Sequence, residues 1–74
     1  MTIIRARLGR RVRSIRKAAG KVQKEVAFDA ATTVWNISRL EHGTKIPRVE
    51  GLERIATALG VEIADLFDFE FEES

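Results

Sequence analysis

The sequence has no cysteine, one proline, one histidine and no long apolar run. Without cysteine it can form neither a disulfide framework nor a thiolate metal site. No carboxylates are spaced to join His42 around a metal ion, so we expect no metal and no cofactor. No segment approaches the ~20 apolar residues of a membrane span, and the start lacks the apolar stretch of a signal peptide. These absences predict a globular cytoplasmic protein without a membrane partner.

The charge that is present is unevenly distributed along the 74 residues, a length typical of one domain. The net charge is only +2, but residues 1–24 carry nine basic side chains and no acidic one. Residues 61–74 carry six acidic side chains and no basic one. Such segregation would attract a polyanion to one end of the molecule. Charge alone leaves two interpretations open, a nucleic-acid interface and ordinary solvated helix faces.

Hydrophobic periodicity predicts an all-α protein. Leu8, Val12 and Ile15 repeat with helical spacing, and Gly20 follows at the position of a left-handed helix cap. The second and third helices are separated by so few residues that they must cross steeply, as in a helix-turn-helix. We expect five helices, at about residues 4–19, 23–30, 33–42, 48–59 and 62–67. They would form one domain over residues 1–67, followed by an acidic and aromatic tail over 68–74.

The segment QKEVAFDAATTVWNISRLEHG, residues 23–43, carries a family resemblance. It resembles the helix-turn-helix of lambda-repressor-like regulators of the Cro/XRE class, and residues 8–17 and 45–67 are similar to the flanking helices. The resemblance implies a compact five-helix DNA-binding domain whose second and third helices form the motif. It further implies a sequence-specific regulator of transcription that binds double-stranded DNA. We expect a dimeric repressor or controller protein, and no enzyme.

In this family the third helix enters the major groove with its N-terminal part. Carried onto this sequence, the resemblance predicts that base edges are contacted by Val34, Trp35, Ser38 and Arg39. Arg39 can donate two hydrogen bonds to guanine, whereas Val34 and Trp35 are suited to thymine methyl groups. An exposed tryptophan is costly unless something covers it. DNA is one cover, and packing against the second helix or a dimer contact is the alternative.

The resemblance also predicts contacts to DNA phosphates, which position a protein without reading sequence. We expect these contacts from Gln23, Thr33, Asn36, His42, Lys45 and Arg48, with Arg10 and Arg11 free to attract phosphate. Ordinary solvent exposure is the alternative for Gln23 and His42. The positions of Arg16 and Glu41 match those of an interhelical salt bridge in the family, so we assign this pair a structural role.

Two positions depart from the family pattern. Val22 stands where the family usually has Ser or Thr, so a helix cap worth about 1 kcal/mol is missing. Ala31 stands where the turn of the motif usually has glycine, and a positive φ there would cost alanine about 1 kcal/mol. Both departures predict a less stable motif with its DNA contacts intact.

The C-terminal end is the surface left for dimerisation. One helix-turn-helix unit contacts few base pairs, so such proteins bind as dimers to half-sites about 34 Å apart. We expect the two-fold contact to involve Ile63, Leu66, Phe67, Phe69 and Phe71. A frayed acidic tail is the alternative for the last residues.

Three rival functions can be weighed from the sequence. An enzyme is the first rival, because Ser38 and His42 lie four residues apart on one helix. This spacing is common, however, and the sequence offers no oxyanion site beside it. A protein-interaction module is a stronger rival, because a fold does not determine function and some related proteins cover a toxin partner. RNA binding is weaker, since one tryptophan does not make a stacking platform. The sequence offers no pocket for a small-molecule ligand.

Overall fold

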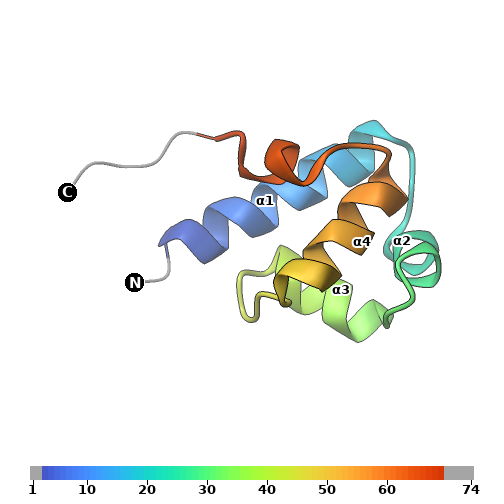
Figure 1. Cartoon of the computed structure of the whole chain (residues 1–74). Helices are drawn as coiled ribbons and strands as arrows, with labels where there is room; N and C mark the ends of the chain where they lie inside the picture. The colour runs from blue at the N-terminus through green and yellow to red at the C-terminus, as the bar shows by residue number, and fades with distance from the viewer. Residues whose placement is uncertain (1–2, 70–74) are drawn as a thin grey trace.

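The computed structural model describes residues 3–69, and the regular secondary structure in this range is entirely helical. Helices α1 (Ile3–Ala18), α2 (Gln23–Asp29), α3 (Val34–Glu41) and α4 (Val49–Leu59) are followed by η1 (Ile63–Phe67). Figure 1 shows η1 lying beside α1, with α4 in the middle of the molecule and α2 and α3 beyond it. Helix α3 also packs against α1. The all-α prediction is confirmed for these residues. No helix within them is long and apolar enough to cross a membrane.

One apolar core joins all five elements. Its fully buried members come from α1 to α3 and from η1, and α4 closes the core with a stripe of five buried residues. The largest side chains in the core are Leu8, Val12, Val26, Ile37, Leu40 and Leu66. The periodic apolar positions of the sequence therefore face inward, as a 3.6-residue repeat requires.

The crossing of α1 and α3 depends on Gly9. A Cβ atom at this position would overlap the carbonyl oxygen of Leu40 and lie 2.6 Å from that of Glu41. Only glycine allows the backbones of the two helices to approach this closely. The last turn of α3 is thereby held against the first half of α1.

Helices α2 and α3 are joined by a turn in which Ala31 has a φ of 56°. This is the left-handed conformation anticipated for that position, and Ala31 is the only non-glycine residue with positive φ among residues 3–69. The amide of Thr32 donates to the carbonyl of Ala27 over 2.9 Å, which closes the end of α2. The turn therefore keeps the geometry of the motif although alanine is strained there.

The two helices of the motif begin differently. Val22 has no side-chain acceptor for α2, but the Glu25 carboxylate accepts a hydrogen bond from the Val22 amide (2.9 Å). This is half of a capping box, which partly replaces the missing cap. Helix α3 has a full cap, because the hydroxyl of Thr33 accepts from the Asn36 amide over 3.1 Å.

The fifth element differs from the expected α-helix. It is a 3-10 helix of five residues, in which the Asp65 amide donates to Glu62 three residues earlier (2.9 Å). A segment this short forms too few α-type bonds to offset the cost of helix nucleation. The described residues therefore form four α-helices and one 3-10 helix.

Candidate nucleic-acid interface

Helix α3 divides into a buried face and an exposed face. Ile37 and Leu40 are fully buried, whereas Trp35 is 68% exposed and Val34 is 43% exposed. Two large apolar side chains therefore stand in solvent at the start of the helix. This excludes the alternative in which Trp35 packs back against α2.

Trp35 and Arg39 touch on the exposed face of α3. The guanidinium carbon of Arg39 lies 5.7 Å from the centroid of the Trp35 ring, within cation–π range. The two side chains are one helical turn apart, which places them on the same stripe of the helix. A positive charge and an aromatic surface are thus presented together.

Ser38 and His42 are also neighbours, but their geometry does not suit catalysis. The Nδ1–H of His42 donates to the Ser38 carbonyl over 2.8 Å, and the Ser38 hydroxyl lies 3.5 Å from the same nitrogen. A nitrogen that donates to a carbonyl cannot also accept the proton of the serine. The Nε2 atom of His42 is the ring nitrogen left for an external partner.

Polar residues at the start of α3 bond to one another. Asn36 donates through its side-chain amide to the Thr32 hydroxyl over 2.9 Å, and Thr33 is occupied as the helix cap. Each hydroxyl still has a proton to donate. Thr33 and Asn36 are both exposed, so a phosphate contact from either side chain remains a prediction.

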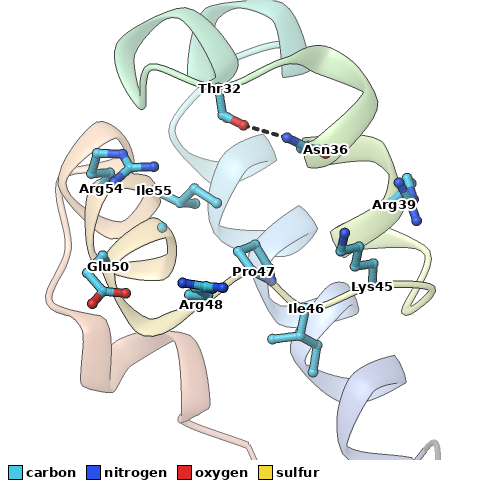
Figure 2. Close-up of a pocket in the computed structure, with 11 residues that line it drawn as sticks. Thr32, Asn36, Arg39, Lys45, Ile46, Pro47, Arg48, Glu50, Arg54 and Ile55 are labelled. Atoms are coloured by element: carbon cyan, nitrogen blue, oxygen red, sulfur yellow. Dashed lines mark hydrogen bonds between the residues drawn. The ribbon is translucent and has the colours of Figure 1, made fainter.

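A groove of about 370 Å³ runs between α3 and the start of α4. Figure 2 shows Arg39 and Lys45 at one side of it and Glu50 and Arg54, from α4, at the other. The groove is lined by Thr32, Asn36, Arg39, Lys45, Ile46, Pro47, Arg48, Glu50, Gly51, Arg54 and Ile55. Four of these residues are basic and one is acidic, so the groove favours an anion. Sequence reasoning did not anticipate this groove.

Arg54 is the basic lining residue that the sequence analysis did not single out. Its Nε donates to the carbonyl of Ala30 over 3.0 Å, which ties α4 to the end of α2. The spacing of Arg54 on α4 marks it only as a solvent-facing position. Its partner lies 24 residues away, so no local pattern could have revealed the contact.

A buried ion pair connects α1 with the end of α3. Arg16 donates to both carboxylate oxygens of Glu41, from Nε over 2.6 Å and from Nη2 over 3.0 Å, and to the Lys21 carbonyl over 2.9 Å. The hydrogen bonds that Arg16 donates to Glu41 raise the pKa of Arg16 above its ordinary value, against the effect of burial. The side chain of Gln23 donates to the same carboxylate over 3.0 Å. Gln23 is therefore positioned by Glu41.

The two α1 arginines expected to attract phosphate differ in the structure. Arg10 is exposed and has no hydrogen bond or ion pair within residues 3–69. Arg11 instead donates to the carbonyl of Asp65 over 2.9 Å and lies 3.7 Å from the carboxylate of Asp68. Arg11 thus fastens η1 to α1, which leaves it poorly placed for DNA.

The residues expected at the dimer contact also divide. Leu66 is completely buried in the core of a single chain, so its assignment to a surface contact was wrong. Ile63 and Phe69 are half-buried and pack against the core, whereas Phe67 is 36% exposed with its ring 6.4 Å from that of Phe69. Phe71 lies outside the described residues. Leu66 is buried because a 3-10 helix has three residues per turn, so residues three apart along this segment share the face that contacts the core.

Comparison with known proteins places this architecture in a family. The helix-turn-helix domain family matches residues 7–68. Control protein C.BamHI of Bacillus amyloliquefaciens is 37% identical over 67 residues, which cover 89% of this chain and 83% of that protein. The chain therefore belongs to the helix-turn-helix family, in its Cro/XRE-like class of DNA-binding transcriptional regulators, and is not an enzyme.

Solved structures agree in fold. The restriction-modification controller protein C.AhdI of Aeromonas hydrophila superposes with a TM-score of 0.82 at 29% identity, covering 84% of this chain and 94% of that one. The clp gene regulator ClgR of C. glutamicum has a TM-score of 0.81 at 32% identity, covering 89% and 86%. Among residues 3–69 no group of three side chains could hold a metal ion.

Proposed function

We propose that this protein is a dimeric controller-type regulator that binds a specific operator in double-stranded DNA, with α3 in the major groove. The observation that carries the proposal is the pair of exposed Trp35 and half-buried Arg39 on the outer face of α3. Such a pair combines the donor that guanine accepts with an apolar surface for a base methyl group. The likeness to control protein C.BamHI and to a restriction-modification controller protein supports the controller role. Its place of action would be the cytoplasm.

The base contacts in this proposal come from Val34, Trp35, Ser38 and Arg39. The flanking phosphates are held by Lys45, Arg48 and Asn36 at the groove, and by Gln23, Thr33, His42 and Arg10 elsewhere on the chain. The exposed basic rim of the groove supports this assignment, because phosphate contacts depend on accessible cations. Arg54 joins the set through its place in the groove.

The test is fluorescence anisotropy of labelled DNA from upstream of the protein's own gene, against a scrambled duplex, over a series of salt concentrations. We expect tight binding to the native duplex alone, with affinity falling steeply as salt rises. Arg39→Ala should weaken binding to the native duplex by about tenfold or more. Arg13→Ala removes the same charge from an exposed site on α1 and is the matched control. Equal, weak binding to both duplexes, with no preferred site in a random library, would contradict the proposal.

Dimerisation through the η1 end is a separate part of the proposal. Phe67 is exposed there and would be buried against a second copy. The variant Phe67→Ser should convert a dimer to a monomer in sedimentation velocity, because it removes apolar surface from the contact. Phe28→Ser is the control, since Phe28 is 85% exposed on α2, away from η1. A dimer that survives Phe67→Ser and dissociates with Phe28→Ser would place the interface on α2.

A further inference from the structure

We propose that Trp35 and Arg39 act as one unit that recognises a guanine beside a pyrimidine bearing a C5-methyl group. This inference rests on the proposed function, in which α3 lies in the major groove. Arg39 sits 5.7 Å from the Trp35 ring, so the two side chains reach DNA together. That distance is less than two base-pair steps of about 3.4 Å each, which confines their targets to neighbouring base pairs.

The contact with Trp35 leaves the hydrogen-bonding edge of Arg39 available. A guanidinium approaches an aromatic ring with its flat face, while its N–H groups point outward in the same plane. Within residues 3–69 no carboxylate or carbonyl accepts a hydrogen bond from the Arg39 side chain. Two parallel N–H groups match the O6 and N7 acceptors of guanine. Trp35 therefore restrains the arginine in a form suited to guanine.

Trp35 supplies the second half of the unit. Its ring is 68% exposed, and Val34 beside it is 43% exposed, so the start of α3 presents apolar surface to the groove. Among the four standard bases only thymine carries a methyl group in the major groove. A methylated cytosine carries the same group at the same carbon. The shared chemistry is a C5-methyl, and the source is thymine or 5-methylcytosine.

The experiment begins with selection of bound duplexes from a random library, followed by anisotropy titrations of the selected site. We expect a guanine adjacent to a thymine in every selected half-site. Replacing that thymine by deoxyuridine removes only the methyl group and should weaken binding by about fourfold. Replacing the T·A pair by 5-methylcytosine·G should bind more tightly than cytosine·G at the same place. Equal affinity for those two cytosine duplexes, with the deoxyuridine loss intact, supports the unit with thymine as its source.

Variants of the protein test whether the two side chains act together. With Trp35→Ala, the thymine and deoxyuridine duplexes should bind equally, and the preference for guanine over adenine should fall. Arg39→Lys keeps the charge but loses the two parallel donors, so the guanine preference should fall by about tenfold while the methyl effect remains. Trp35→Phe, which keeps an aromatic face, should retain most of both preferences. Both residues lie outside the core, so thermal unfolding of the variants should match that of the parent.

The outcomes separate this inference from the proposed function. If no specific sequence is selected, the proposed function fails and the inference fails with it. If a specific site is selected but thymine and deoxyuridine bind equally, only the methyl-reading unit is overturned. Independent effects of the two substitutions, which add in the double variant, would contradict coupled recognition.

Discussion

Basic residues serve different purposes in two regions of this molecule. On α1, Arg11 and Arg16 use their guanidinium groups to hold other parts of the chain. At the α3–α4 face, the side chains of Lys45 and Arg48 have no hydrogen bond or ion pair within residues 3–69. Sequence alone counts all four as positive charges. The difference teaches that availability, rather than number, decides which cations can meet DNA.

The largest expected effect is on the free energy of unfolding, at the buried ion pair of α1. Arg16→Ala would leave the Glu41 carboxylate buried without its partner, which costs about 3–5 kcal/mol of unfolding free energy. That is a large fraction of the stability of a small domain. Urea unfolding followed by circular dichroism measures it. Arg13→Ala, an exposed charge on the same helix, should change stability by less than about 0.5 kcal/mol.

A second test of the contacts made by α1 removes its close approach to α3. Gly9→Ala places a methyl group against the carbonyls of Leu40 and Glu41, and should cost about 1–3 kcal/mol by overpacking. Ser14→Ala, at an exposed position of α1, is the control and should be neutral or slightly stabilising. An unchanged melting temperature for Gly9→Ala would show that the two helices can separate without loss.

Substituting one basic residue in each region tests whether the two sets of cations have different functions. Lys45→Ala or Arg48→Ala should weaken binding to operator and scrambled DNA alike and reduce the salt slope by about 1. Their thermal unfolding should stay unchanged. Arg11→Ala should instead leave the salt slope intact and lower stability by about 1 kcal/mol, through loss of its bond to Asp65. A reduced slope for Arg11→Ala would return this residue to the phosphate contacts.

The smallest effect is expected at the turn between α2 and α3. Ala31→Gly relieves a positive φ and should raise stability by about 1 kcal/mol, or roughly 4–8 °C in melting temperature. The affinity for the operator should not change, because Ala31 is not predicted to contact DNA. Ala18→Gly, in the last turn of α1, is the opposite control and should destabilise.

Local patterns in the sequence predicted most of the fold. Hydrophobic spacing placed the α-helices within one or two residues of their observed ends, and the strain at Ala31 followed from the family turn. Contacts between distant segments were not predictable in this way. Arg54 reaches a carbonyl 24 residues away and Arg11 reaches one 54 residues away. The burial of Leu66 likewise depends on how η1 docks, which no spacing within η1 determines.

The shared carboxylate of Glu41 has a consequence for genetics. It accepts hydrogen bonds from Arg16 and Gln23 at once, so a change at Glu41 releases both α1 and the side chain at the start of α2. A screen for clones in which the protein no longer regulates its target should therefore return alleles at Arg16 and Glu41 alongside those at Arg39. The first two would mimic contact mutants although neither side chain reaches the double helix. Only their low protein levels in the cell would tell the two groups of alleles apart.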